Sequence, residues 1–267
     1  GGNLENNGDF NHAGLTITLD GTSPQAIRGD FSSLTNYFDD LRLENQVVIG
    51  QGVRLETNLR ILGHLLNTGL VDPLNNTITF DDTTQQSLSG QWATNDAHLH
   101  SLRINNPQGI ELPGNVWFSG QLSNFGQLTP DTTGFTAMGN NTQTLAGTWG
   151  ATNGYFSEFT LLNNAGLDLP DTLYIKDSLI LANGTINTNG HLVVVENPLP
   201  DAVVFPAWPS VQSYVNGPLQ RAVSQARVYS FPLGKTGKGY QLANVNITDV
   251  GTATQLTGEF IASPVTS

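Results

Sequence analysis

The residues Leu88-Ser89-Gly90-Gln91-Trp92 are the strongest indication of the fold, because closely similar sequences occur at two other places in the chain. One lies earlier, around Gly29, and the other lies later, around Gly147. Each time an apolar residue stands two positions before the glycine, and an aromatic residue stands two positions after it. Self-similarity at a long period is typical of proteins built from stacked structural units, so the chain contains an internal repeat of about 60 residues.

The residues on either side of the three glycines also agree without gaps, and most are apolar or aromatic. The matched sets are Ile17, Ile78 and Phe135; Ile27, Leu88 and Leu145; Phe31, Trp92 and Trp149; Tyr37, His98 and Tyr155; Leu41, Leu102 and Phe159; and Asn45, Asn106 and Asn163. Apolar residues two apart, such as Leu41 and Leu43, indicate strands with one buried face. Residues 59–66 also fit a short helix, but Gly63 and the repeat register weaken that interpretation.

A repeat unit of this length is too long for one coil of a solenoid, but it divides into three coils of about 20 residues, stacked about 4.8 Å apart. The sequence therefore predicts an all-β protein, a parallel β-helix (β-solenoid) with a C-terminal antiparallel β-sandwich-like or capping segment. We expect Phe31, Trp92 and Trp149 to stack in one aromatic column. We expect Asn45, Asn106 and Asn163 to occupy one corner, where asparagine tolerates left-handed backbone.

The amino-acid composition and the length of the strand-like runs change near residue 200. Residues 1–200 contain the repeat and the sequence predicted to form the last coils. Residues 201–267 contain prolines, most of the lysines and longer strand-like runs. We therefore expect a solenoid over residues 1–200, and a capping coil with the start of a β-sandwich module over residues 201–267. The start at Gly1 and the single methionine, Met138, lead us to expect a piece of a longer polypeptide.

Composition excludes several classes of protein. A net charge of −12 leaves no basic stripe for nucleic acid, and no apolar run is long enough to span a membrane. The chain has no cysteine, so disulfides and thiolate metal sites are excluded. We expect no cofactor, although an acidic surface favours divalent cations and leaves calcium as an open alternative.

A segment near the C-terminus resembles secreted surface proteins of Bacteroidota. The similar residues are Ser213-Tyr214-Val215-Asn216-Gly217-Pro218-Leu219-Gln220-Arg221 and Tyr229-Ser230-Phe231-Pro232-Leu233-Gly234-Lys235, preceded by the coil text of residues 181–190. The resemblance covers about residues 173–262, and Gln241 and Leu242 depart from it. It implies an extracellular, cell-surface adhesin or appendage protein with β-helix coils before a β-sandwich module, often exported by type IX secretion. It implies no catalytic residues.

Two kinds of polar cluster could carry chemistry. Adjacent carboxylates occur at Asp39-Asp40 and Asp81-Asp82, but neighbours on a strand point to opposite faces, so neither pair can flank one glycosidic bond. His98 and His100 share a strand face and could hold a metal, yet no third ligand stands nearby. We expect turn acids and an aromatic-ladder or surface role for His98, so we assign no catalytic, cofactor-binding or metal residues.

Threonine-rich strands and aromatic residues suggest a ligand-binding face as the alternative. Residues 15–18 and 77–79 form threonine-rich runs, and Trp117, Tyr155 and Trp208 could stack on sugars, or equally pack in the core. The main prediction is a structural or adhesive module of a large extracellular protein or filament, a stiff rod that self-associates and is not an enzyme. Its expected partners are other copies, adjoining modules or cell-surface glycans. The alternative is a carbohydrate-binding or polysaccharide-cleaving β-helix.

Overall fold

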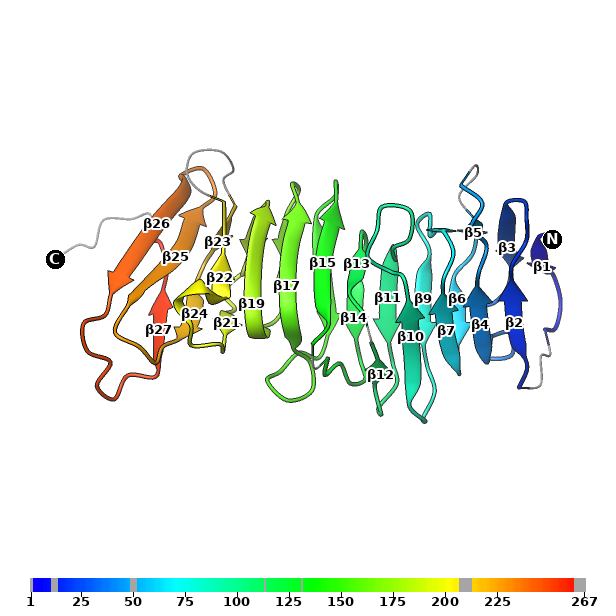
Figure 1. Ribbon diagram of the computed structural model, residues 1–267, viewed down its shortest axis with the longest axis horizontal. Helices are drawn as coiled ribbons and strands as arrows, with labels where there is room; N and C mark the ends of the chain where they lie inside the picture. Colours follow the sequence, from blue (N-terminus) through cyan, green and yellow to red (C-terminus); the bar gives the residue numbers. More distant parts are fainter. Residues whose placement is uncertain are drawn as a thin grey trace. The chain divides into compact units, whose positions relative to one another are not determined.

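The structure is a computed structural model that describes residues 2–10, 14–48, 52–112, 114–130, 132–206 and 213–261. The predicted fold class is confirmed, because these residues form a β-solenoid of short strands and contain no α-helix, only a 3-10 turn at Pro200–Ala202. None of the helices in the described part could cross a membrane. The chain folds as two compact units, residues 1–133 and 134–267, and each is described by itself (Figure 1).

Unit 1 contains three sheets of parallel strands. Sheet 1 has the order β1-β3-β5-β8, sheet 2 the order β2-β4-β7-β10-β12, and sheet 3 the order β6-β9-β11-β14. The strands are β1 (Leu4–Asn6), β2 (Thr16–Leu19), β3 (Gln25–Gly29), β4 (Asp40–Leu43), β5 (Val53–Leu55), β6 (Leu59–Ile61), β7 (His64–Asn67), β8 (Val71–Asp72), β9 (Thr77–Phe80), β10 (Gln86–Gly90), β11 (Ser101–Ile104), β12 (Ile110–Glu111), β13 (Val116–Phe118) and β14 (Leu122–Asn124).

The chain visits the three sheets in turn, which makes each circuit one coil of the solenoid. From β5 in sheet 1 it passes through β6 in sheet 3 and β7 in sheet 2, then returns to sheet 1 at β8. Figure 1 shows β2, β4, β7 and β10 side by side in this stack. Residues 59–66, whose sequence also fits a short helix, lie in β6 and β7 and in the bend between them.

Inward-pointing leucines form the core of unit 1 and stack from coil to coil. Leu41 pairs with Leu65, and Leu65 pairs with Leu88, and all three side chains are buried. The residues between them, such as Arg42 and Leu66, point the other way, as the strand period requires. Burying a leucine side chain contributes about 1.5–3 kcal/mol, so each column stabilises the stack at every coil.

The sequence repeat does not contain a whole number of coils. Ser87 lies 23 residues after His64, its register partner on the previous coil. His64 in turn lies 24 residues after Asp40, which its amide contacts. Three coils of this length need more residues than separate Gly29 from Gly90, so equivalent residues advance by one sheet. Gly29 ends β3 in sheet 1, whereas Gly90 ends β10 in sheet 2.

The predicted stacking of equivalent residues is wrong within unit 1 for this reason. Phe31 forms a bridge to Leu59 at the edge of sheet 3, whereas Trp92 forms a bridge to Val116 of β13. Asn45 follows β4 in sheet 2, and Asn106 follows β11 in sheet 3. The repeat thus preserves the local shape of the chain while it moves around the solenoid.

Unit 2 contains two sheets. Sheet 4 has the order β15-β17-β19-β21-β24-β27, with β22 also paired to β19, and sheet 5 has the order β16-β18-β20-β23-β25-β26. The strands are β15 (Gly134–Gly139), β16 (Gln143–Gly147), β17 (Phe156–Asn163), β18 (Leu167–Asp168), β19 (Leu173–Asn183), β20 (Thr185–Asn187), β21 (Val193–Val195), β22 (Val203–Val204), β23 (Tyr214–Asn216), β24 (Leu219–Ala222), β25 (Val228–Lys235), β26 (Gly239–Asn246) and β27 (Gln255–Gly258).

Strand direction changes only at the end of unit 2. Parallel pairing continues past residue 200, since β23 pairs with β20, β24 with β21, and the end of β25 with β23. Antiparallel pairing begins with β26, which pairs with all of β25, and with β27, which pairs with β24. The β-sandwich itself stays a prediction, because two antiparallel strand pairs do not yet define one.

Candidate functional site

The repeat glycines stand where neighbouring coils come closest. Gly29 and Gly90 have φ values of +89° and +92°, and Gly147 has +95°. A Cβ atom on Gly90 would lie 1.9 Å from the carbonyl oxygen of Asn67 on the previous coil, and one on Gly29 would lie 1.9 Å from that of Asn6. No other residue fits at Gly29 or Gly90 without moving the backbone, so these two repeat glycines have a structural role.

The repeat asparagines form a buried hydrogen-bond bridge between coils. Asn106 Nδ2 donates to Gln86 Oε1 at 2.9 Å, while Asn106 Oδ1 accepts from the Gln108 amide at 2.7 Å. The same pair of contacts occurs around Asn45 and around Asn163. All three asparagines are at most 1% exposed. Because a buried amide is costly unless hydrogen-bonded, each bridge fixes both the turn and the spacing of two coils.

Sequence reasoning missed the glutamines of this bridge. Gln25, Gln86 and Gln143 each stand four residues before a repeat glycine and are buried. Gln86 Nε2 donates to the carbonyls of Ile61 and Gly63, so both the nitrogen and the oxygen of its side-chain amide are hydrogen-bonded. The sequence did contain a signal for them. A polar residue that recurs at the same strand position in every repeat indicates a repeated structural contact, just as a recurring apolar residue indicates the core.

The repeat aromatic residues pack within their own segment. Phe31 stacks on Phe38 with ring centres 4.8 Å apart, and Trp149 stacks on Phe156 at 5.2 Å, each with an interplanar angle of 19°. Trp92 has no aromatic residue at the equivalent position, and its Nε1 donates to the Ser89 carbonyl at 2.9 Å. These residues fill the core, as their burial shows.

The carboxylates of the two acidic pairs Asp39-Asp40 and Asp81-Asp82 do not act together, because three of them contact different partners. Asp40 Oδ1 accepts from the His64 amide at 2.8 Å. Asp81 forms an ion pair with Arg60, with 2.9 Å between Oδ2 and Nε. The Thr84 hydroxyl donates to Asp82, and this hydrogen bond lowers the pKa of the Asp82 carboxyl. Each of these three acids thus has its own partner.

The two neighbouring histidines are desolvated. Burial lowers the pKa of both His98 and His100, and His98 Nδ1 has no hydrogen-bond partner among the described residues. His100 Nδ1 lies 3.2 Å from Ser119 Oγ. No set of three or more His, Asp or Glu side chains in the described part of the chain is grouped to hold a metal ion.

The strongest candidate for a binding surface is a shallow groove on the outer face of sheet 3, which we call the Arg60 groove. Its volume is about 650 Å³. All but one of its lining residues have polar side chains: Ser32, Ser33, Leu34, Asn58, Arg60, Thr77, Thr79, Asp81, Arg103 and Asn105. Arg60, Thr79 and Arg103 are register partners on successive strands β6, β9 and β11, which places their side chains in one row.

The two arginines of the Arg60 groove differ in how they are held. Arg60 is only 14% exposed, lies 5.4 Å from the centre of the Tyr37 ring, and donates to the carbonyls of Ser33 and Leu34. Arg103 is exposed, and its guanidinium lies 4.6 Å from the ring centre of Phe125, which is 52% exposed. Arg60 is therefore a fixed part of the wall of the Arg60 groove, and Arg103 is available to a ligand.

The remaining candidates for a ligand-binding face are scattered. Thr16 and Thr18 are exposed on β2, whereas Thr77 and Thr79 lie in the Arg60 groove. Trp117 and Tyr155 are half-buried, and Tyr155 lies 5.0 Å from Lys176 Nζ. Trp208 lies outside the described residues.

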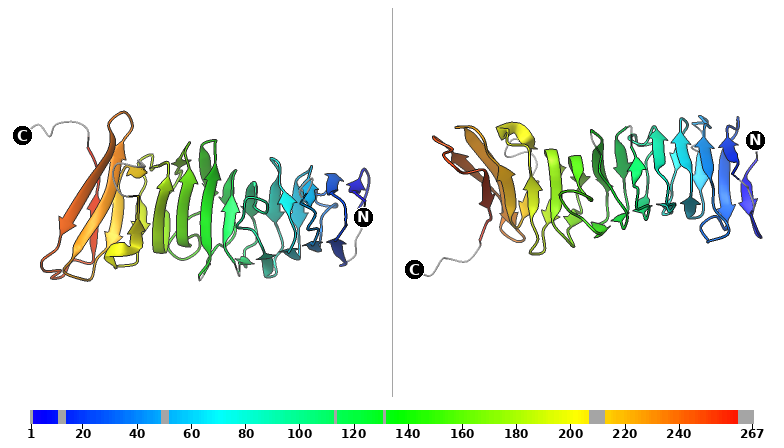
Figure 2. Two further views of the ribbon diagram at one scale, coloured as in Figure 1. Left: turned by 45° about the horizontal axis from the view of Figure 1, so that its top comes forward. Right: turned by 90° about the horizontal axis from the view of Figure 1, so that it is seen from below.

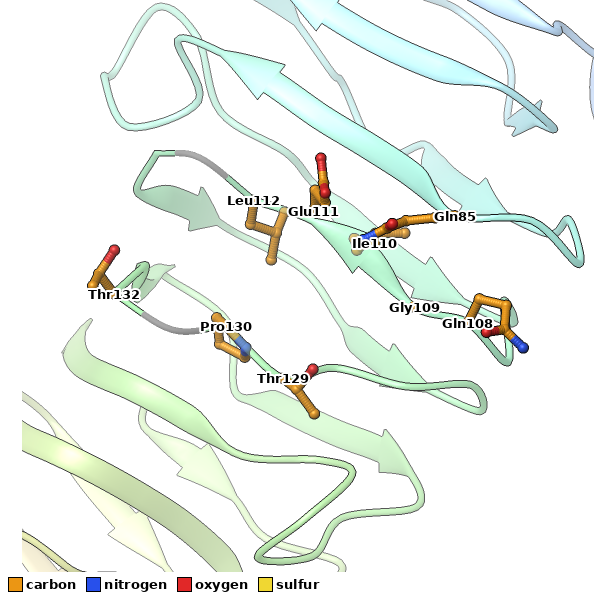
Figure 3. A pocket seen from close by; sticks show the side chains of 9 residues that line it. All are labelled: Gln85, Gln108, Gly109, Ile110, Glu111, Leu112, Thr129, Pro130 and Thr132. Atoms are coloured by element: carbon orange, nitrogen blue, oxygen red, sulfur yellow. The ribbon is translucent and has the colours of Figure 1, made fainter.

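A second hollow of about 480 Å³ lies beside β12 (Figure 3). Figure 3 shows its lining residues coming from three stretches of chain: Gln85, residues 108–112, and Thr129, Pro130 and Thr132. Among the described residues that line it, Glu111 is the one charged residue. A single carboxylate without a charged partner offers no acid and base pair, so the Arg60 groove is the better candidate.

A buried arginine organises residues 213–235. Arg221 is fully buried on β24, and Nη1 donates to the Ser230 carbonyl at 2.7 Å. Nη2 donates to the carbonyls of Leu199 and Pro200 at 3.1 and 2.7 Å. Burial lowers the pKa of Arg221 to about 10, which leaves it charged at neutral pH. No carboxylate lies within ion-pair distance of it among the described residues, so carbonyl groups and aromatic rings make its direct contacts, while the more distant charge of Asp201 also favours the cation.

Comparison of the chain with models of protein families, with curated proteins and with solved structures gives no match.

Proposed function

We propose that the chain is a structural or adhesive module of a large extracellular surface protein, with no catalytic activity. The observation that carries this proposal is the use of buried polar residues. Asn45, Asn106 and Asn163 each bridge to a glutamine 20 residues earlier, so the repeated polar residues hold coil to coil and are inaccessible to a ligand. A fold whose repeated elements are devoted to stacking is suited to mechanical continuity.

Mechanical stretching of single molecules tests the proposal. A structural module should resist extension and unfold in discrete steps, because the hydrogen-bonded bridges between coils must break together. Extension at low force without discrete steps would contradict the mechanical role. Release of reducing or unsaturated ends from acidic polysaccharides would contradict the absence of catalysis.

Carbohydrate binding is the second candidate function, and the Arg60 groove favours it. An accessible guanidinium and several side-chain amides and hydroxyls line the groove, and the exposed ring of Phe125 lies beside Arg103. These are the groups that sugar-binding sites use. The groove carries two arginines and one aspartate in a chain whose net charge is −12, which favours a carboxylated saccharide. A glycan array that includes uronate oligosaccharides tests this function.

Arg103→Gln should abolish any such binding and leave folding intact, because the Arg103 side chain is exposed. The matched control is Arg54→Gln, whose side chain is 44% exposed on sheet 1, away from the groove. Equal loss in both variants would indicate a general effect of charge, and binding that survives Arg103→Gln would remove the groove from consideration.

A further inference from the structure

Strand β26 is an open edge that the described chain does not cover. It is the last strand of sheet 5, it pairs with β25 on one side, and no described strand pairs with its other side. Figure 2 shows the hairpin of β25 and β26 (orange) at the C-terminal end of unit 2. Six of its eight residues, from Gln241 to Asn246, are exposed.

The exposed residues include positions that continue the core side of the sheet. Val245 lies opposite Tyr229 and Ala243 lies opposite Phe231, and both aromatic side chains are buried. Val245 is nevertheless 39% exposed, and Leu242, on the other face of β26, is 42% exposed. From Gln241 to Asn246 both faces of the strand are exposed, and no described strand covers its outer edge.

The strand lacks the features that usually prevent edge-to-edge pairing. Exposed edges are commonly protected by charged side chains, prolines or short length. β26 has eight residues, no charged residue and no proline, although the chain as a whole carries a charge of −12. A neutral strand of this length is where two copies of an acidic protein can approach without local repulsion.

We propose that β26 is a homotypic interface, in which it pairs antiparallel with β26 of a second copy about a two-fold axis. A two-fold axis brings the same patch of both subunits together, which suits a self-complementary antiparallel pair. Charge also fits, since Lys238 precedes the strand and Asp249 follows it, so each end brings Lys238 near Asp249 of the partner subunit. The inference rests on the proposed structural role, because it names the partner of that module.

Sedimentation velocity over a concentration series tests the interface. The unmodified chain should reach a dimer limit. Leu242→Glu should raise the dimer dissociation constant about tenfold or more, because it places like charges near the centre of the pair. Val245→Glu should weaken the dimer less, because it places a charge near one end of the pair. The matched control is Leu162→Glu, because Leu162 is also 42% exposed but lies on β17, an interior strand of sheet 4. It changes the net charge equally and should leave the dimer intact.

Crosslinking identifies the geometry. The chain has no cysteine, so Ala243→Cys introduces a single thiol near the middle of β26, and it should form a disulfide-linked dimer on oxidation. Leu162→Cys should not. A monomer at all concentrations, an equal effect of all three glutamate variants, or a series of species beyond the dimer would each overturn the proposal. Stretching experiments on the monomer are unaffected by these results, so failure of the interface is distinguishable from failure of the structural role.

Discussion

The guanidinium carbon of Arg221 lies 5.4 Å from the centre of the Tyr229 ring, and both residues hold the same short segment of chain. The Tyr229 hydroxyl donates to the Pro198 carbonyl at 3.0 Å, while Arg221 Nη2 donates to the carbonyls of Leu199 and Pro200. Both residues belong to the C-terminal segment of residues 213–235. The two residues therefore have a structural role, because they fasten residues 198–200 to β24 and β25.

Replacement of Arg221 should destabilise unit 2. Arg221→Leu leaves the carbonyls of Leu199, Pro200 and Ser230 without their donor, and we expect a loss of about 3–5 kcal/mol in the free energy of unfolding. Arg221→Lys should recover part of it. Urea denaturation measures the loss, with the exposed Arg227→Leu as the control, for which we expect a change within about 0.5 kcal/mol. Equal stability of the Arg221 and Arg227 variants would contradict this account.

Close approach of two coils, and not the backbone angle alone, should make Gly90 irreplaceable. Gly90 and Gly190 share a φ of +92°, but a Cβ on Gly190 would meet no atom within 4 Å. Gly190→Ala should therefore cost only the left-handed strain of about 1–2 kcal/mol. Gly90→Ala adds a clash with the Asn67 carbonyl, so its loss in thermal or urea unfolding should be clearly larger. Equal losses would show that the clash relaxes at little cost.

The local structure was easier to predict from the sequence than the three-dimensional register. Gly90 and Leu88 mark a strand that ends in a left-handed residue, and both features depend on near neighbours in the chain. Whether Asn106 stacks on Asn45 depends instead on the exact length of each coil, and this length varies within unit 1. The step from β3 to β5 is much longer than the step from β5 to β8. A few extra loop residues in a coil move the residues that follow to another sheet. The sequence near those residues does not reveal this change, because it depends on the length of the whole coil.

The candidate site was only partly accessible to sequence reasoning for a related reason. Arg60 and Arg103 lie far apart in the sequence and meet only because β6, β9 and β11 are adjacent in sheet 3. Arg221 stands at an inward position in an otherwise ordinary strand, and nothing in its neighbours distinguishes a buried arginine from an exposed one. The proximity of Arg60 to Arg103 and the burial of Arg221 both depend on the strand register, which the sequence alone does not determine.

The bridge between Asn106 and Gln86 should contribute much more to stability than its exposed surroundings. Asn106→Ala removes the buried donor to Gln86 Oε1 and the part-buried acceptor for the Gln108 amide, and we expect a loss of about 2–4 kcal/mol in unfolding free energy. The adjacent Asn105→Ala is the control, since Asn105 is half-buried and contacts the exposed Arg103. Asn45→Ala should repeat the effect. A loss at Asn106 no greater than at Asn105 would contradict the bridge.

Burial of His98 should make unit 1 less stable in mild acid. Its pKa is lowered below the ordinary value of 6.5 by desolvation, so below that pH the unfolded chain binds a proton that the folded chain does not. The free energy of unfolding should therefore fall as the pH drops from about 6.5 towards 5, well above the range where the carboxyl groups titrate. His98→Tyr removes this group and installs the residue found at the equivalent positions Tyr37 and Tyr155. Thermal melts across this range should show a shallower pH dependence for His98→Tyr, and an unchanged slope would exclude His98 as its origin.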